Sequence, residues 1–160
     1  MAIAWRSLQP RGREALASRK SAPLEAFLPL SQRDDVRLVD LQYGETSAER
    51  EAFARAGGAL SRIEGLDLFN DLDGVLAAIA ACDLVVTTSN VTAHLAGALG
   101  RETWLIHVGA HPAFFYWMPN PDGHSLWYPS VKIIGGGAGG GWKDALAKVS
   151  RRLDATIGKR

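Results

Sequence analysis

The middle of the chain reads Cys82-Asp-Leu-Val-Val-Thr-Thr-Ser-Asn-Val-Thr-Ala-His94, and this stretch decides the fold. Leu84-Val85-Val86 is apolar without alternation, which is typical of a central strand covered on both faces. Small hydroxyl and amide residues follow at once, and a segment of helical period begins at Asn90. A buried strand that turns directly into a helix is the repeating unit of an α/β fold with a parallel sheet.

The same alternation of short aliphatic runs and longer helical segments extends toward both ends of the chain. The predicted strands are Ala2–Trp5, Val36–Gln42, Leu60–Glu64, Leu84–Thr87, Thr103–Val108 and Val131–Ile134. The predicted helices are Pro23–Gln32, Ser47–Ala56, Asp71–Cys82, Asn90–Leu99 and Trp142 to about Ala155. Ser47 and Asp71 are expected to open their helices, and Gly100 to end one. We therefore expect a Rossmann-like, three-layer α/β/α fold with a mostly parallel sheet of about six strands.

Length, charge and composition limit the class of protein. The 160 residues fit a single domain over 1–160. A net charge of +1 gives no global attraction to nucleic acid or an anionic membrane. No secretory signal is visible, and the longest apolar stretch, Val75 to Cys82, is far below the ~18–20 residues of a membrane helix. The single cysteine, Cys82, cannot form an internal disulfide, which indicates either a reducing compartment or indifference to redox state. We expect a cytoplasmic protein without a transmembrane segment or a nucleic-acid partner.

Ligands of open α/β sheets bind beyond the carboxyl ends of the strands, so the segments that leave those ends carry the candidate chemistry. The first strand is followed by a basic segment in which the lone acid is Glu14. Its basic residues are Arg6, Arg11, Arg13, Arg19 and Lys20. This segment is either a phosphate-binding loop or a solvated basic loop.

The central strand ends in Thr87-Thr88-Ser89-Asn90, which turns straight into the next helix. Residues of this kind can cap a helix and leave its free N–H groups directed at an anion, and a diphosphate would fit there. His94 lies in the first turn or so of that helix. It is either close to the same anion or a core histidine with a satisfied hydrogen bond.

Two later loops are unusual in composition. The loop 109–129 is long and rich in aromatic residues, which favours either a small satellite core or a wall for a base or sugar. No Cys or acidic partner stands in metal-ligand register with its histidines, so no metal is proposed. The run Gly135–Gly141 is either a flexible loop or a phosphate cradle, and it lacks the Gly-Lys-Ser/Thr ending of a P-loop.

At these residues the chain resembles the heptosyltransferase-like glycosyltransferases. This group includes the lipopolysaccharide heptosyltransferases of glycosyltransferase family nine and the related C-terminal domains of bacterial tetratricopeptide-repeat proteins. The resemblance centres on Cys82–Trp104. The surrounding matches, in the same order as in the family, are Ile3–Ser7, Lys20–Leu24, Leu41–Gly44, Leu72-Asp73 and Trp127–Ser130.

The resemblance implies the C-terminal, donor-binding lobe of a GT-B glycosyltransferase, which binds a nucleotide-diphosphate sugar as donor substrate and needs no further cofactor. In that family a lysine in the place of Lys20 meets the donor phosphates, and the turn and helix that match Ser89 to His94 hold the diphosphate and sugar. The residues expected at the donor phosphates are Arg6, Lys20, Thr88, Ser89, Asn90, Val91, Thr92 and His94. The residues expected to wall a base or sugar pocket are Tyr43, Tyr116, Trp117 and Trp127.

The chain departs from the family pattern in ways that bear on catalysis. Ser89 stands where the family commonly has Asp, and Phe115-Tyr116-Trp117 stands where related members carry Trp-Arg-Trp. The lobe that binds acceptor and usually supplies the catalytic base is absent from the sequence. Two hypotheses follow. The chain is the donor-binding lobe of an inverting glycosyltransferase that needs an N-terminal lobe or partner subunit, or it is an inactive binding or interaction module with the same fold.

Overall fold

The computed structural model describes residues 1–7, 19–109, 112 and 114–157. Its strands are β1 (Ala2–Ala4), β2 (Val39–Asp40), β3 (Val85–Thr87), β4 (Thr103–His107) and β5 (Val131–Gly135). Its α-helices are α2 (Leu28–Ser31), α3 (Ser47–Arg55), α4 (Leu72–Ala81), α5 (Val91–Ala98) and α6 (Trp142–Ile157). Two 3-10 helices, η1 (Leu24–Phe27) and η2 (Phe115–Trp117), complete the described elements.

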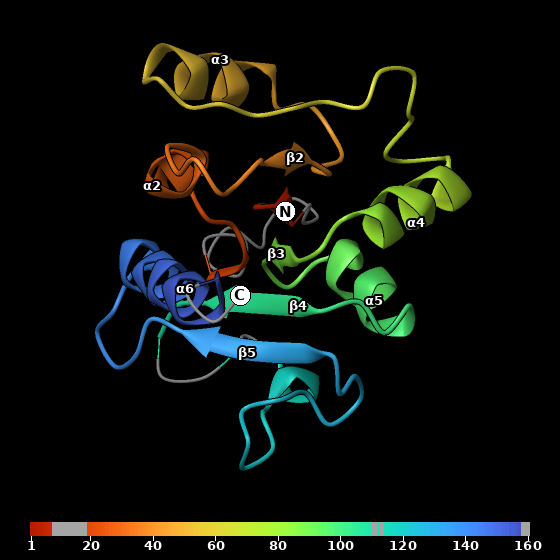
Figure 1. The fold of residues 1–160 in the computed structure, drawn as a ribbon. Helices are drawn as coiled ribbons and strands as arrows, with labels where there is room; N and C mark the ends of the chain where they lie inside the picture. Colours follow the sequence, from red (N-terminus) through yellow and green to blue (C-terminus); the bar gives the residue numbers. More distant parts are fainter. Residues whose placement is uncertain (8–18, 110–111, 113, 158–160) are drawn as a thin grey trace, which may run out of the picture.

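The strands form one parallel sheet in the order β2-β1-β3-β4-β5. Figure 1 shows α2 and α6 on one side of this sheet and α4 and α5 on the other. The α/β, Rossmann-like fold class predicted from the sequence is therefore confirmed, with five strands in the described part of the chain instead of about six.

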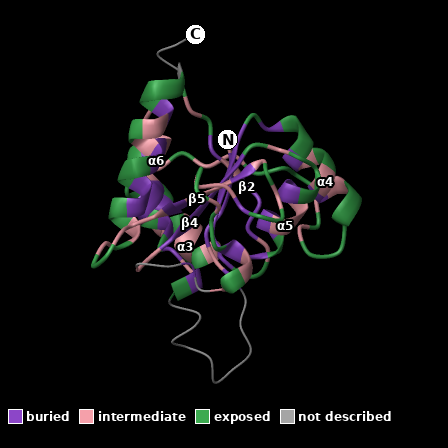
Figure 2. Cartoon of the chain, turned by 90° about the horizontal axis from the view of Figure 1, so that it is seen from below, coloured by how far each residue is buried: buried purple, intermediate pink, exposed green. Residues whose placement is uncertain are grey.

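The alternation of side chains along the strands explains the two covered faces. Ile3 and Val86 point to one face and pack with η1, α2, α3 and α6. Ala2 and Val85 point to the other face and pack with α4 and α5. Figure 2 shows the same division, with buried residues concentrated at the sheet and exposed residues on the outer sides of the helices.

Three local expectations are wrong. Leu60–Glu64 is not a strand, because Ser61 makes a single bridge to Val39 and no ladder follows. Pro23–Gln32 is not one helix, because Pro29 has no N–H to continue it, and the chain divides into η1 and α2. Ser47 does not cap its helix. Instead its N–H donates to Glu45 Oε1 at 2.7 Å.

Other helix ends are as predicted. Asp71 caps α4 by accepting the N–H of Gly74 at 2.8 Å. Gly100 follows the end of α5 with φ of +65°, a left-handed conformation that favours glycine. None of the helices in the described segments has the length and apolar character that crossing a membrane would require.

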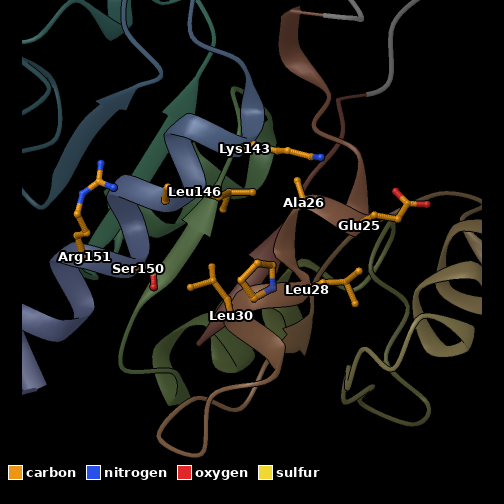
Figure 3. A pocket seen from close by; sticks show the side chains of 10 residues that line it. Glu25, Ala26, Leu28, Leu30, Lys143, Leu146, Ser150 and Arg151 are labelled. Carbon is orange, nitrogen blue, oxygen red and sulfur yellow. The ribbon is translucent and has the colours of Figure 1, made fainter.

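A groove of about 580 Å³ lies between the η1–α2 segment and α6 (Figure 3). Leu30 and Leu146 contribute apolar side chains to it, and Lys143 stands at its edge. It lies on the face of the sheet opposite to α5. This groove is therefore separate from the strand-end residues described next.

Candidate functional site

The strand order places a topological switch point between β1 and β3. The chain adds β2 on one side of β1 and then β3 on the other side. In doubly wound sheets of this order, ligands bind in the crevice that opens at the carboxyl ends of those two strands. The segments that leave β1 and β3 are the ones that the sequence analysis selected.

Asn90 joins these two segments. Its Oδ1 accepts the N–H of Ala93 at 3.2 Å and so caps α5. Its Nδ2 donates to the carbonyls of Ala4 at 3.4 Å and Arg6 at 3.3 Å. Thr87 Oγ1 donates to the same Ala4 carbonyl at 2.8 Å. The N-terminus of α5 is thus fixed against the end of β1.

The turn before α5 retains polar groups with no protein partner. The side chain of Thr88 is fully buried, and its hydroxyl has no hydrogen-bond partner among the described residues. The first N–H groups of α5, on Val91 and Thr92, likewise have no acceptor within the described segments. Free N–H groups at a helix N-terminus, together with the helix dipole, favour an anion.

Lys20 supplies a cation at this edge. Ala22 N donates to the carbonyl of Trp5 at 2.7 Å, which brings the residues before it back to the end of β1. The Lys20 side chain is only 7% exposed. Its ammonium lies 4.7 Å from the centre of the Phe114 ring and makes no ion pair with a carboxylate of the described residues. Burial lowers the pKa of this amine.

His94 lies within a cluster of aromatic rings. Its ring centre is 4.7 Å from that of Trp117 and 5.7 Å from that of Tyr116. Tyr116 in turn stacks on Phe114 at 5.0 Å, which connects His94 to the ring beneath Lys20. Burial and, second, the charge of Lys20 lower the pKa of His94. The imidazole is therefore neutral at pH 7.

The side chains of Ser89 and Trp117 form a hydrogen bond. The indole Nε1 of Trp117 donates to Ser89 Oγ at 3.0 Å, and the Trp117 side chain is completely buried. The Ser89 hydroxyl is thus held by the aromatic loop. Trp117 is a buried residue that packs against the His94 ring, and it is not an exposed wall of a pocket.

Arg6 has divided roles. Its carbonyl belongs to the Asn90 network, whereas its guanidinium forms an ion pair with Glu49 of α3. Glu49 also accepts the indole N–H of Trp5. The guanidinium therefore faces the β2 side of β1, and its contact with a phosphate stays a prediction.

The four aromatic residues predicted to share a pocket do not gather in one place. Tyr116 and Trp117 lie beside His94. Tyr43 lines a separate cavity of about 280 Å³ at the end of β2, where its ring is 6.3 Å from that of Phe69. Trp127 is 69% exposed and makes no ring contact within the described part of the chain.

The glycine run forms a close turn after β5. Gly136 N donates to the carbonyl of His107 at 3.0 Å. A Cβ on Gly140 would meet the Gly136 carbonyl oxygen at 2.1 Å, so this approach of backbone to backbone requires glycine. The run leaves the sheet two strands beyond β3. Its use as a phosphate cradle stays a prediction.

Two residues that were not predicted to belong to the site, Phe114 and Tyr128, contact its predicted residues. Phe114 supports Lys20, and Tyr128 contacts His94 through its hydroxyl at 3.2 Å. The Trp-Tyr-Pro sequence at 127–129 was the available signal for Tyr128. The predicted basic residues Arg11 and Arg13, and also His111, lie outside the described residues.

Comparison with known proteins gives one informative similarity. The chain is 34% identical to Protein FlbA of Caulobacter vibrioides over 153 residues, which make up 94% of this chain and 24% of FlbA. The chain therefore spans about a quarter of the length of this curated relative. No family model and no solved structure matches the chain. The similarity indicates a domain shared with part of FlbA.

Proposed function

We propose that this chain is the nucleotide-diphosphate-sugar-binding lobe of an inverting GT-B glycosyltransferase, and that a second lobe or subunit completes the transfer. The observation that carries the proposal is Lys20, a residue only 7% exposed whose charge acts on His94 of α5 and which has no carboxylate partner among the described residues. A buried charge without a counter-ion is costly. A bound diphosphate would supply the missing negative charge.

The proposed binding mode assigns separate roles to the residues of the switch point. Lys20 and the free N–H groups of Val91 and Thr92 contact the diphosphate oxygens. In transfer by inversion the same groups stabilise the negative charge that develops on the leaving diphosphate. The cavity beside Tyr43 and Phe69 receives the base or ribose, because it lies at the end of the strand next to β1.

The base that deprotonates the acceptor is assigned to the other lobe or subunit. Glu49, an acid at this edge, is already bonded to Arg6 and Trp5. An acid held in this way is poorly placed to accept a proton from an acceptor hydroxyl. We place the reaction in the cytoplasm, in keeping with a single, buried cysteine at position 82.

The test is a thermal-shift panel with ADP, UDP, GDP, CDP and their sugars. A ligand at 100 times its dissociation constant stabilises the protein by about 2.7 kcal/mol, which gives a clear rise in Tm. The nucleotide that binds is then titrated by calorimetry into the Lys20→Met variant. Loss of a charge-assisted contact of about 1.5–3 kcal/mol predicts affinity roughly 10- to 100-fold weaker.

Lys143→Met is the matched control, because Lys143 is exposed at the groove beside α6. It should leave the affinity unchanged. Equal affinity of Lys20→Met and the unmodified chain would remove Lys20 from the phosphate site.

The second candidate is a non-catalytic binding or interaction module. It is favoured by Ser89, whose hydroxyl occupies the place of the family's carboxylate and is bonded to Trp117. If none of the nucleotides or nucleotide sugars raises the Tm, this second function replaces the first.

A further inference from the structure

Tyr128 reaches His94 from the loop that follows β4. The two ring centres are 5.8 Å apart with an interplanar angle of 72°, and Tyr128 Oη lies 3.2 Å from His94 Nδ1. Tyr116 and Trp117 contact the imidazole only as rings. Tyr128 therefore provides the side-chain hydrogen bond that His94 makes within the described segments.

The direction of this bond follows from what each partner can donate. A phenol has one O–H to donate, and within the described residues the hydroxyl of Tyr128 has no acceptor other than His94 Nδ1. A neutral imidazole carries its proton on one nitrogen and accepts on the other. If Tyr128 donates to Nδ1, the proton of His94 is on Nε2.

Helix α5 is built to receive the Tyr128 ring. Gly97 stands three residues after His94, on the same side of the helix. A Cβ at Gly97 would meet Tyr128 Cγ at 2.5 Å and its Cβ at 2.9 Å. The missing side chain at Gly97 thus lets the tyrosine lie against the helix with its hydroxyl beside the imidazole.

Among the described residues, the groups that face His94 are Lys20, Tyr116, Trp117 and Tyr128. None of these four carries a negative charge at pH 7, so none of them favours the imidazolium. Nε2 has no hydrogen-bond partner in the part of the chain that the structure describes. A neutral N–H close to the charge of Lys20 is suited to an anion.

We propose that Tyr128 is a positioning residue that holds His94 in the Nε2–H tautomer, so that His94 donates a hydrogen bond to a bound phosphate oxygen and does not act as a base. The tautomer follows from the protein alone. The phosphate contact rests on the proposed nucleotide-diphosphate function.

Nitrogen-15 NMR of the His-labelled chain without ligand tests the tautomer. At pH 7.5 we expect His94 Nδ1 to show the shift of an unprotonated nitrogen and Nε2 that of a protonated one. Tyr128→Phe keeps the ring and removes the hydroxyl, and the two nitrogens should then move toward the averaged shifts of exchanging tautomers. Trp127→Phe, a change at an exposed neighbour, should leave the His94 shifts unaltered.

Gly97→Ala gives a second, independent variant, because its methyl group displaces Tyr128. It should reproduce the shift changes of Tyr128→Phe. A protonated Nδ1 in the unmodified chain, or identical His94 spectra in the unmodified chain and Tyr128→Phe, would overturn the positioning role.

A separate titration tests the phosphate contact. Tyr128→Phe should weaken binding of the nucleoside diphosphate found in the thermal-shift panel by about 2- to 10-fold, as expected for one hydrogen bond. The expected tautomer together with no nucleotide binding by any variant would refute the proposed function and leave the role of Tyr128 standing. Unchanged nucleotide affinity in Tyr128→Phe, with the tautomer altered, would refute the phosphate contact of His94.

Discussion

Asn90 holds together the parts of the chain that form the site. It caps α5 and also bonds two carbonyls at the end of β1. Other helix caps of the molecule, such as Asp71 on α4, serve one helix and lie at the surface. The same type of capping interaction therefore has a larger structural consequence at Asn90.

Asn90→Ala should lower the free energy of unfolding more than Asp71→Ala does. Loss of a side-chain N-cap costs about 1 kcal/mol, which is the expectation for Asp71→Ala. Asn90→Ala also leaves buried polar groups of β1 and Thr87 with fewer partners, which adds about 1–3 kcal/mol. Urea denaturation of both variants measures the difference. Equal destabilisation would show that the bonds from Asn90 to β1 contribute nothing.

At the scale of elements, the segment 114–130 has an inner side and an outer side. Trp117 and Tyr128 of this segment contact His94. Phe115 and Trp127 are 80% and 69% exposed. Neighbouring aromatic residues of one irregular segment therefore differ completely in environment.

Trp117→Ala should destabilise the protein by about 3–5 kcal/mol, the usual cost of removing a buried aromatic side chain. Trp127→Ala should change the free energy of unfolding by no more than about 0.5 kcal/mol. Chemical denaturation checks both values, and Trp117→Phe keeps a ring in the core in case the alanine variant does not fold. A large loss of stability in Trp127→Ala would contradict the outer position of that side chain.

The inward and outward positions of neighbouring aromatic residues in this segment could not be predicted from the sequence, whereas other parts of the site could. The strand–turn–helix at 84–99 was predictable, because an apolar run, a capping residue and Gly100 all specify the same local structure. Tyr128 and Trp127 are adjacent in a segment with no regular period. Residue type alone cannot tell which of them turns inward, and Trp127 was predicted where Tyr128 contacts the site.

In the sheet, too, some strands could be predicted from the sequence and one could not. Leu60–Glu64 holds two aliphatic residues of a predicted strand, Leu60 and Ile63, yet Ile63 is 42% exposed and Ser61 makes one bridge. Residues three positions apart point to opposite faces of a strand, so Leu60 and Ile63 give this segment no continuous apolar face to bury in the sheet. The inner strands were predictable because both of their faces are apolar.

At the scale of the whole molecule, a net charge of +1 conceals an uneven distribution. Arg33, nearer the surface, is paired with Asp35 and Asp154. Lys20 is buried at the strand ends without such a pair in the described part of the chain. A charge kept in this state is expected to reduce stability in return for ligand affinity.

Lys20→Met should therefore raise the free energy of unfolding at pH 7, by about 1 kcal/mol after the lost cation–π contact with Phe114 is taken into account. Because burial lowers the pKa of Lys20 below its usual 10.5, the unfolded chain binds more protons than the folded chain between those two pKa values. The stability contribution of Lys20 then increases as the pH rises through that window. The difference in free energy of unfolding between Lys20→Met and the unmodified chain should therefore be smaller at pH 10 than at pH 7.

Urea denaturation of the unmodified chain and of Lys20→Met at pH 7 and at pH 10 measures this difference in free energy of unfolding. Lys143→Met serves as the control, because Lys143 is exposed and its replacement should change stability by no more than about 0.5 kcal/mol at either pH. If Lys20→Met were less stable than the unmodified chain at pH 7, the ammonium would have to gain more from its surroundings than it loses by burial. A site already compensated in that way would have no need of a diphosphate.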